Sequence, residues 1–399
     1  MNAIDGVVPR EVIEPASAED LAAALASASQ KRASVVIRGG GTKIEWGRPP
    51  ASIDILLGTK RLNKVVAHEY ADLTATMQAG ARIDDVNREL ARHGQWVPIE
   101  SPFEGATIGG AIATNDSGPL RHRYGTPRDL VIGVRLALTD GRLIKAGGNV
   151  VKNVAGYDLG KLVSGSFGSL AAIVSATFKL MPLPAASSTL IATFDRASAL
   201  VPALAAITGS QLEAAACELH VSASRGSADG HYRLLLKFES TPGALNAHVQ
   251  KARSLLGGAK CDVVAAAMES ETWRDHARSV WQSPGIVVRA SWLPASLGGV
   301  LAFIDDMRGN TTDVEVAGRG ALGSGLFRID GDAPAQRAAV ERMRSRSDLF
   351  RHVVLLHAST ELKQHVDAWG SLGDAGPIGG AIKQALDPHG ILNAGRGPV

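Results

Sequence analysis

The chain has 399 residues, 45% of them hydrophobic, and this length favours two domains, each with its own core. Its 42 Lys+Arg and 39 Asp+Glu leave a formal charge of only +3, so we expect no nucleic-acid partner. Two cysteines, Cys217 and Cys261, are too few for a disulfide framework and favour a reducing compartment, so the expected location is the cytoplasm.

The first apolar run is short and breaks at Arg10 and Glu11, so we expect no secretory signal. No apolar stretch reaches the roughly 20 residues of a membrane span, so any membrane association is expected to come through a partner. The 44 glycines contrast with 18 aromatic residues (6 Trp, 4 Tyr, 8 Phe) and fall in clusters. Such clusters indicate loops in which the backbone lines a site.

The N-terminal part predicts a small α/β unit. Ser17, with Asp20 three residues later, is a helix-capping signal, and Asp140-Gly141 is a tight-turn signal between two apolar segments. Prolines at Pro182 and Pro184 mark the expected domain boundary. In chain order the expected elements are a helix with Leu21 and Leu25, a strand at 35–37, an apolar segment at 53–57, a strand at 74–78, a helix with Ile83, Val86 and Leu90 that ends by Gly94, and a hairpin from Val131–Thr139 to Leu143 and Ile144.

Beyond the prolines the predicted order is β-α-β-β-α-β, twice. The first set is a strand at 190–194, a helix at 197–208, strands at 213–222 and 232–238, a helix at 243–256 and a short strand near Val263. After an amphipathic segment at 273–281, the second set is a strand at 286–292, a helix at 296–307, strands at 312–316 and 326–329, a helix at 334–346 and a strand at 353–356. This order predicts a duplicated ferredoxin-like unit. A last helix, 381–386, is expected to stop at Asp387-Pro388-His389-Gly390.

A strand running into three glycines, Arg38-Gly39-Gly40-Gly41-Thr42-Lys43, is the first glycine run. Glycines let backbone N–H groups turn around an anion such as a diphosphate. Neither the Walker nor the Rossmann pattern is met, and Trp46, Pro49 and Pro50 exclude the long helix that both require. Taken by itself, the run is equally consistent with a plain glycine turn.

Small residues also fill nearly every position of a second run, 102–118. Such a run lets a flat ligand or a phosphate lie against the main chain, with Thr107, Asn115 and Ser117 as hydrogen-bonding groups, and the alternative is a close-packed loop. A third run begins at Gly147-Gly148, includes Lys152-Asn153-Val154-Ala155-Gly156-Tyr157-Asp158-Leu159 and continues through Gly165 and Gly168 to Val174.

Together the three runs resemble the FAD-binding domain of the vanillyl-alcohol oxidase / p-cresol methylhydroxylase (PCMH) family, over residues 10–184. Within that family, segment 152–159 is most similar to the smaller FAD-binding subunits of glycolate oxidases, and 386–395 is similar to the family's C-terminal signature. The resemblance implies an α+β chain. Its parts would be a two-part PCMH-type FAD-binding domain (1–184), a cap domain of duplicated ferredoxin-like units (185–380) and a C-terminal segment that returns to the FAD domain (381–399).

The resemblance also implies the cofactor residues. Arg38, Gly39, Gly40, Gly41, Thr42 and Lys43 would grip the FAD diphosphate. Thr107, Ile108, Gly109, Gly110, Asn115, Ser117 and Gly118 would line the ribityl chain and the ring, Ile173 would lie by the adenine, and Pro102 and Gly125 would be further contacts. Relatives that bind flavin covalently often have a histidine where this chain has Thr42, so the FAD is expected to be non-covalent. Lys152 and Tyr157 are either flavin neighbours or structural residues.

The implied function is that of an FAD-binding subunit of a glycolate oxidase, which converts a small 2-hydroxy acid to a 2-oxo acid. Two separate cysteines cannot hold an iron–sulfur cluster, so the expected partners are an iron–sulfur subunit and a larger FAD-containing subunit. Three alternatives stay open: a self-contained FAD-dependent 2-hydroxy-acid dehydrogenase, a non-catalytic assembly subunit, and a nucleotide-sugar enolpyruvate reductase. No general base can be named from the sequence.

Two further patterns are expected not to form sites. His352 and His357 lie five residues apart on a predicted strand, so they are expected to point to opposite faces and to bind no metal. Gly318-Arg319-Gly320-Ala321-Leu322-Gly323 matches the dinucleotide pattern, but a strand follows it instead of a helix. We therefore expect a loop between cap-domain strands, with Arg319 as a candidate contact for a carboxylate or a partner.

Overall fold

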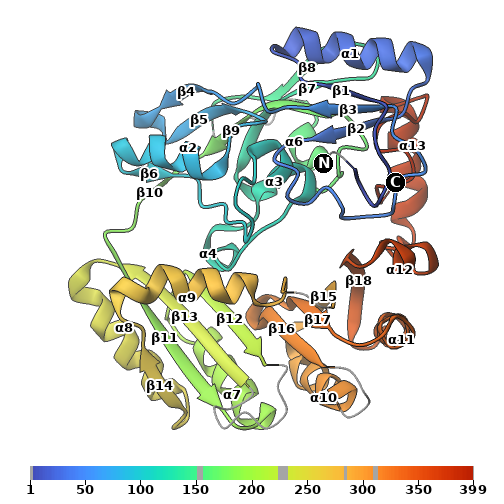
Figure 1. The fold of residues 1–399 in the computed structure, drawn as a ribbon. Coiled ribbons are helices and arrows are strands. Elements are labelled where there is room, and N and C mark those ends of the chain that lie inside the picture. Colours follow the sequence, from blue (N-terminus) through green and yellow to red (C-terminus); the bar gives the residue numbers. More distant parts are fainter. Residues whose placement is uncertain (1–2, 151–155, 223–231, 283–284, 309–312, 399) are drawn as a thin grey trace. The chain divides into compact units, whose positions relative to one another are not determined.

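The structure is a computed structural model that describes all residues except 1–2, 151–155, 223–231, 283–284, 309–312 and 399. The chain divides into two compact units, whose helices and strands are labelled in Figure 1. The first unit comprises residues 1–118, 124–183 and 371–399, and the second comprises 119–123 and 184–370. The chain therefore passes between the units four times, and residues 119–123 belong to the second unit although both flanking segments belong to the first.

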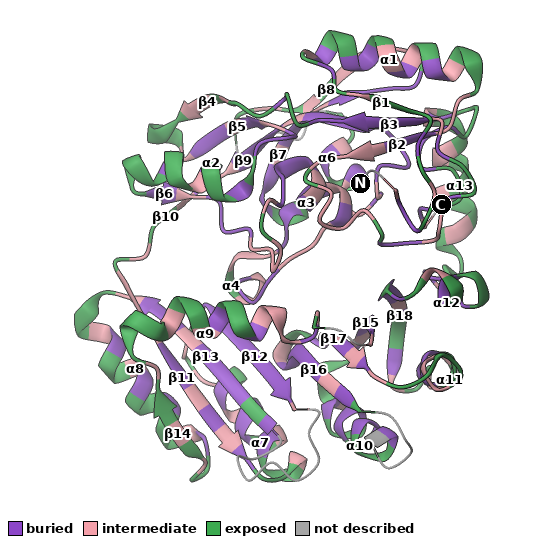
Figure 2. Ribbon diagram, in the orientation of Figure 1, coloured by how far each residue is buried: buried purple, intermediate pink, exposed green. Residues whose placement is uncertain are grey.

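A three-stranded parallel sheet with the order β1-β3-β2 opens the first unit. The predicted helix cap is confirmed, because the Ser17 hydroxyl accepts a hydrogen bond from the N–H of Asp20 at 3.0 Å. Leu21 and Leu25 of this helix are buried against the sheet, while its outer face is exposed (Figure 2). The elements are β1 (Glu11–Ile13), α1 (Ala18–Lys31), β2 (Val35–Arg38) and β3 (Ile55–Gly58).

A five-stranded antiparallel sheet with the order β4-β5-β9-β7-β8 forms the rest of the first unit. The predicted hairpin is confirmed: β7 pairs with β8, and Gly141 takes a φ of 87° in the turn between them. Residues of the sheet and of several helices share one core around Met77, Ile112 and Phe178. The elements are β4 (Val65–Glu69), β5 (Thr74–Gln78), α2 (Ile83–Leu90), α3 (Ile108–Thr114), β7 (Val131–Ala137), β8 (Leu143–Gly147), α6 (Leu159–Val163) and β9 (Ala172–Lys179).

Short elements connect these parts. Strand β6, which follows α2 in the chain, pairs with β10, which follows β9. Gly94 ends the turn after α2 in a left-handed conformation (φ 66°), as the sequence predicts. The short elements are η1 (Tyr70–Asp72), η2 (Ala91–His93), β6 (Gln95–Trp96), α4 (Arg121–Tyr124), α5 (Pro127–Leu130) and β10 (Met181–Pro182).

One antiparallel eight-stranded sheet with the order β14-β11-β13-β12-β16-β17-β15-β18 forms the second unit. Numbered 1 to 4 within each half, the strands of both halves have the ferredoxin-like order 4-1-3-2, and the halves meet where β12 pairs with β16. The predicted strand and helix order is confirmed. The elements are β11 (Ala186–Phe194), α7 (Ala197–Thr208), β12 (Ala216–Val221), β13 (Tyr232–Ser240), α8 (Pro242–Leu255), β14 (Lys260–Val263), α9 (Ala266–Ser279), β15 (Ile286–Trp292), η3 (Pro294–Ser296), α10 (Leu297–Arg308), β16 (Val314–Arg319), η4 (Gly320–Leu322), β17 (Ser324–Ile329), α11 (Ala333–Ser345), β18 (Phe350–His357) and α12 (Thr360–His365).

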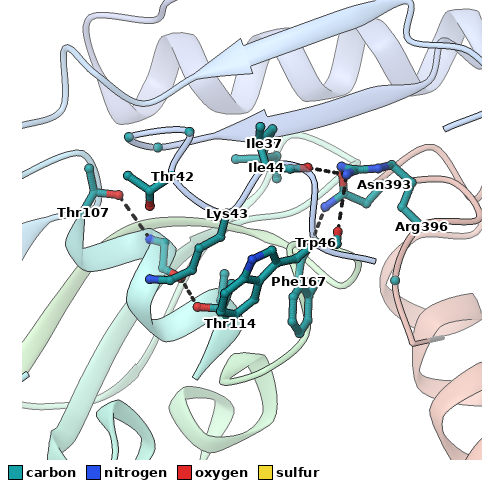
Figure 3. A pocket seen from close by; sticks show the side chains of 16 residues that line it. Ile37, Thr42, Lys43, Ile44, Trp46, Thr107, Thr114, Phe167, Asn393 and Arg396 are labelled. Atoms are coloured by element: carbon teal, nitrogen blue, oxygen red, sulfur yellow. Dashed lines mark hydrogen bonds between the residues drawn. The ribbon is translucent and has the colours of Figure 1, made fainter. Parts of the chain in front are cut away.

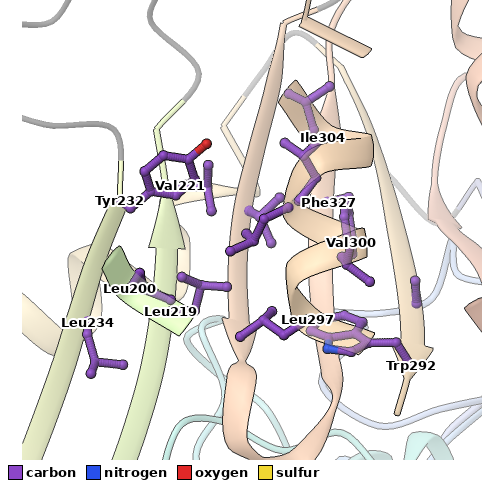
Figure 4. Packing of buried hydrophobic residues seen from close by; sticks show 14 of the residues in the cluster. Leu200, Leu219, Val221, Tyr232, Leu234, Trp292, Leu297, Val300, Ile304 and Phe327 are labelled. Carbon is purple, nitrogen blue, oxygen red and sulfur yellow. The ribbon is translucent and has the colours of Figure 1, made fainter. Parts of the chain in front are cut away.

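The two faces of this sheet differ in chemistry. One face carries the large apolar core that packs against α7, α8, α10 and α11; Figure 4 shows Leu297, Val300 and Ile304 of α10 lying against it. The other face is polar in its centre, where α9 contributes Trp273 and His276. In the glycine string, Gly318 and Arg319 are the last residues of β16, and residues 320–323 form the turn to β17, so the expected loop between cap-domain strands is confirmed.

The last helix of the chain, α13 (Ala375–Leu386), begins six residues earlier than predicted. Its first turns contain Gly376 and Gly380, which disfavour helix, and Pro377, which a helix tolerates only near its start. The helix ends at Asp387, as expected. Within the described residues, no helix is long and apolar enough to cross a membrane.

Candidate cofactor site

The glycine loop after β2 lies against the second glycine run. A Cβ on Gly39 would lie 2.3 Å from Thr107 Oγ1, and one on Gly40 would lie 2.0 Å from the carbonyl oxygen of Gly105. Gly41 has a φ of 77°, which side chains rarely adopt. Each of the three glycines is therefore needed, two for close approach and one for its backbone conformation.

The N–H groups of this loop are available to a ligand. None of the five N–H groups from Gly39 to Lys43 donates a hydrogen bond to an acceptor in the described part of the chain. Gly40 is exposed and the other four residues are half-buried. Consecutive N–H groups that have no acceptor in the protein can bind an anion with several oxygens. We call this segment, residues 39–43, the nest.

Two hollows adjoin the nest. The first, about 640 Å³ including its open side, is lined by apolar groups such as Ile37, Trp46 and Phe167 (Figure 3). The second, about 1370 Å³ on the same measure, has charged walls that include Arg38 and Lys60. Gly39, Gly40 and Gly41 line both hollows, so the nest lies between them.

Lys43 lines the first hollow, but its charge is already paired within the protein. Its Nζ lies 2.9 Å from Asp116 Oδ2 and donates to Ser101 Oγ at 3.2 Å. The same ammonium lies 5.7 Å from the ring centroids of Trp46 and of Phe103, so cation–π attraction also holds it. The side chain is only 6% exposed. Arg38, at the edge of the nest, is also ion-paired, because its Nη2 lies 3.9 Å from Glu14 Oε1. The backbone donors of the nest are therefore the main groups that this segment offers to an anion.

Similarity to known protein families agrees with this geometry. A family model for an FAD binding domain matches residues 9–147, a range that contains the nest and the second glycine run. The chain carries an FAD-binding domain of the PCMH type. FAD joins two flat ring systems through a diphosphate, and the five free N–H groups between two hollows match that chemistry.

Proteins with known names share this domain. The chain is 34% identical over 212 residues to the glycolate oxidase subunit GlcD of Bacillus subtilis, covering 53% of this chain and 45% of that protein. It is 33% identical over 226 residues to the glycolate oxidase subunit GlcE of Escherichia coli, covering 56% of this chain and 60% of that protein. It is 26% identical over 426 aligned positions to the D-2-hydroxyglutarate dehydrogenase of Xanthomonas citri pv. viticola, covering 97% of this chain and 89% of that protein.

A solved structure shares the fold of nearly the whole chain. Alkyldihydroxyacetonephosphate synthase superposes with a TM-score of 0.71 at 18% identity, covering 96% of this chain and 75% of that one. The superposition includes the ferredoxin-like unit as well as the FAD-binding domain, because residues 9–147 alone are far less than 96% of the chain. The expected α+β architecture is confirmed.

The structure brings part of the predicted FAD residues together. Residues 38–43, Thr107 and Gly110 line the hollows. Thr107 also caps α3, because its Oγ1 accepts from the N–H of Gly110 at 3.3 Å. Ile108 and Gly109 point inward instead: Ile108 belongs to the core, and a Cβ on Gly109 would lie 2.7 Å from that of Ala79.

The other predicted FAD residues do not line these two hollows, and the structure gives several of them local roles. Asn115 ends α3 in a left-handed conformation, and its Oδ1 accepts from the N–H of Arg128 at 3.1 Å. Gly118 packs against Glu100, and Gly125 has a φ of 82°. Ile173 is buried in the core on β9. Pro102 and Ser117 are half-buried.

Sequence reasoning did not name some of the lining residues. Trp46, Thr114, Phe167, Asn393 and Arg396 all line the first hollow. Two signals could have found them: Phe167 lies inside the third glycine run, and Asn393 lies inside the C-terminal signature that Arg396 follows. Lys152 lies outside the described residues, and Tyr157 is 91% exposed.

The expectation that His352 and His357 point to opposite faces is wrong. A bulge in β18 places His352 opposite Ser291 and His357 opposite Val287. Six residues of β18 therefore face five of β15, and both histidines lie on the polar face. The residues opposite them, Val287 and Ser291, lie four strand steps or about 13 Å apart, so the two histidines are too far apart to share a metal ion. Among the described residues no group of three potential ligands gathers.

Arg319 lies in a buried polar cluster of the second unit. Its Nε is 3.5 Å from Glu218 Oε1, and Glu218 Oε2 is 3.1 Å from His276 Nε2. On neighbouring strands, Arg328 Nη1 lies 2.9 Å from Glu315 Oε2. Arg319 is therefore ion-paired within the protein.

His122, which residues 119–123 bring into the second unit, makes stability depend on pH. Burial lowers the pKa of His122, and the negative charge of Glu218 opposes this shift only in part. The unfolded state, with a pKa of about 6.5, takes up its proton first as the pH falls, so the stability contribution is complete above 6.5 and is lost below it.

We therefore expect the free energy of unfolding to fall between pH 7 and pH 5 more steeply in the natural chain than in a His122→Gln variant. Urea unfolding at several pH values measures this slope. His352→Gln is the control, because that side chain is exposed. Equal slopes for the natural chain and His122→Gln would contradict the assignment.

Proposed function

We propose that this protein is the FAD-binding subunit of a multisubunit glycolate oxidase, which oxidises a small 2-hydroxy acid to the 2-oxo acid. The observation that carries the proposal is the nest of five free N–H groups between two hollows, in an FAD-binding domain similar to those of glycolate oxidase subunits. When bound, FAD supplies the acceptor for a hydride from the alcohol carbon of the acid.

The chain's own part in this chemistry is to bind and orient the cofactor. The N–H groups of Gly39 to Lys43 would hold the diphosphate, with Arg38 at their edge. The apolar walls of the first hollow, including Trp46 and Phe167, would hold a flat ring and exclude water from it.

The proposal also includes partners. With two separate cysteines the sequence holds no cluster of its own to carry electrons onward, so an iron–sulfur subunit would take them, and a larger FAD-containing subunit would hold the main substrate site. The names of GlcD and GlcE, which are subunits, support such an assembly. The complex would work in the cytoplasm and reach the inner membrane only through its partners.

One observation favours a second candidate function. The similarity to a D-2-hydroxyglutarate dehydrogenase extends over 97% of this chain and 89% of that protein, whereas the match to GlcE covers 56% of this chain. A self-contained FAD-dependent 2-hydroxy-acid dehydrogenase would match such a relative along nearly its whole length. In that case the second unit would supply substrate-binding groups within the same chain.

Anaerobic spectroscopy of the purified chain separates these functions. The chain is loaded with FAD, and the loss of the oxidised-flavin absorbance is followed after addition of glycolate, D-lactate or D-2-hydroxyglutarate, with succinate as a control that lacks the hydroxyl group. The subunit proposal predicts stable FAD binding and full reduction only with the partner subunits present. Reduction of the isolated chain would support the dehydrogenase instead. A chain that takes up no FAD would contradict both and favour an assembly subunit.

A further inference from the structure

The side chain of Arg396 joins the end of the chain to the segment that follows the nest. Its guanidinium donates to three alternate carbonyl oxygens: to that of Ile44, to that of Trp46 at 3.5 Å and to that of Arg48 at 3.3 Å (Figure 3 shows Ile44, Trp46 and Arg396). Arg396 is 5% exposed, and this burial lowers its pKa. The guanidinium also donates to Asn393 Oδ1 at 3.5 Å. An ion is expensive to bury, so these bonds help to offset a substantial cost.

The backbone around Arg396 is tied to the same region. The N–H of Val35 donates to Ile391 O at 2.8 Å, and the N–H of Asn393 donates back to Val35 O at 2.8 Å, so this segment extends the parallel sheet beside β2. The N–H of Arg48 donates to Arg396 O at 3.2 Å. Residues 391–397, which we call the latch, therefore contact the strand before the nest and the segment after it.

This arrangement has a direct effect on the nest. A glycine-rich segment is costly to order, because glycine has the most backbone freedom to lose. The nest can present five N–H groups to one ligand only if the chain beyond it is fixed, and beyond Ile44 that chain is held by Arg396. Arginine suits this task because its planar fork carries five donors.

We propose that Arg396 is a positioning residue for FAD: the latch fixes residues 44–48 so that the nest already faces the diphosphate before the cofactor arrives. The inference rests on the assignment of the FAD site to the nest. It assigns to the latch a role in affinity, because a loop ordered in advance loses less entropy on binding.

The second unit offers a matched control. Arg344 is also a partly buried arginine that donates to backbone carbonyl oxygens, namely those of Val353 at 3.3 Å, Asp367 at 2.6 Å and Ala368 at 3.5 Å. Arg396→Met and Arg344→Met remove the same chemistry from different units. If bonds of this kind act only on stability, both variants will change unfolding and neither will change FAD affinity selectively.

The experiment measures the FAD dissociation constant by fluorescence titration of the apo-protein, with urea unfolding of each apo-protein in parallel. We expect Arg396→Met to weaken FAD binding at least about tenfold and Arg344→Met to change it less than about twofold. The FAD affinity of Arg396→Lys should lie between those of the natural chain and Arg396→Met. Lysine keeps the charge, but its ammonium lacks the planar fork that reaches three carbonyl oxygens. Equal FAD affinity in Arg396→Met and the natural chain, or equal losses in Arg396→Met and Arg344→Met, would overturn the proposal.

ADP carries the diphosphate without the flavin ring. Its affinity therefore separates an effect of the variant on the nest from an effect on the contacts of the flavin ring. We expect the same fold-loss for ADP as for FAD in Arg396→Met; a loss for FAD alone would overturn the assignment to the nest. If Arg396→Met does not fold, Arg396→Lys carries the same comparison. If the natural chain binds neither ligand, the assignment of the FAD site is wrong, and the proposed function is wrong with it.

Discussion

A Gly40→Ala variant is expected to lose FAD binding by about 100-fold, equivalent to about 2.7 kcal/mol. The new Cβ would lie 2.0 Å from the carbonyl oxygen of Gly105, which is backbone and cannot turn aside as a flexible side chain would. The loop would have to move away from the second glycine run, and its N–H groups would no longer converge on one ligand. Titration of the apo-protein with FAD measures the loss.

Gly380→Ala is the matched control for this variant. Gly380 lies in α13 of the same unit, and a Cβ added to it would have no neighbouring atom within 4 Å. Its φ is not in the left-handed region, so alanine fits there and favours the helix. We expect natural FAD affinity for Gly380→Ala. Natural affinity in Gly40→Ala would show that the diphosphate does not bind at the nest.

An Asp116→Ala variant is expected to destabilise the protein by about 3 kcal/mol, since it leaves the buried ammonium of Lys43 without a carboxylate. Urea unfolding at neutral pH measures this change. The double variant Lys43→Met/Asp116→Ala should recover much of the loss, because the unpaired charge is then absent. A double variant as unstable as Asp116→Ala would show that the two charges do not act as a pair.

The single variant Lys43→Met separates two roles for this lysine. If Asp116 occupies its charge, FAD affinity will change by less than about threefold, which corresponds to less than about 0.7 kcal/mol. A loss comparable with that of Gly40→Ala would instead support the sequence-based prediction that Lys43 grips the diphosphate. The FAD titration used for Gly40→Ala decides between them.

Local signals predicted most of the elements, because they depend on neighbouring residues alone. The Ser17 cap, the Asp140-Gly141 hairpin and the strand after the glycine string of residues 318–323 all follow from short-range geometry. That a strand leads directly into the nest was also predictable, since β2 ends at Arg38.

Features that depend on distant pairing were not predictable. The bulge in β18 reverses the alternation of side chains, and only the register against β15 reveals it. The pairing of Lys43 with Asp116 joins positions 73 residues apart, and the bonds from Arg396 to Ile44 join positions 352 apart. No local pattern encodes such distances. The move of residues 119–123 into the second unit is likewise a product of tertiary packing.

The latch also sets an order of events during synthesis. Domains tend to fold from the N-terminus as the ribosome extends the chain, yet here the strand before the nest receives its last backbone partners from Ile391 and Asn393. Residues up to Asn393 must therefore leave the ribosome before the backbone pairing beside β2 is complete. If the latch orders the nest, ribosome-bound chains arrested before residue 391 are expected to hold no FAD.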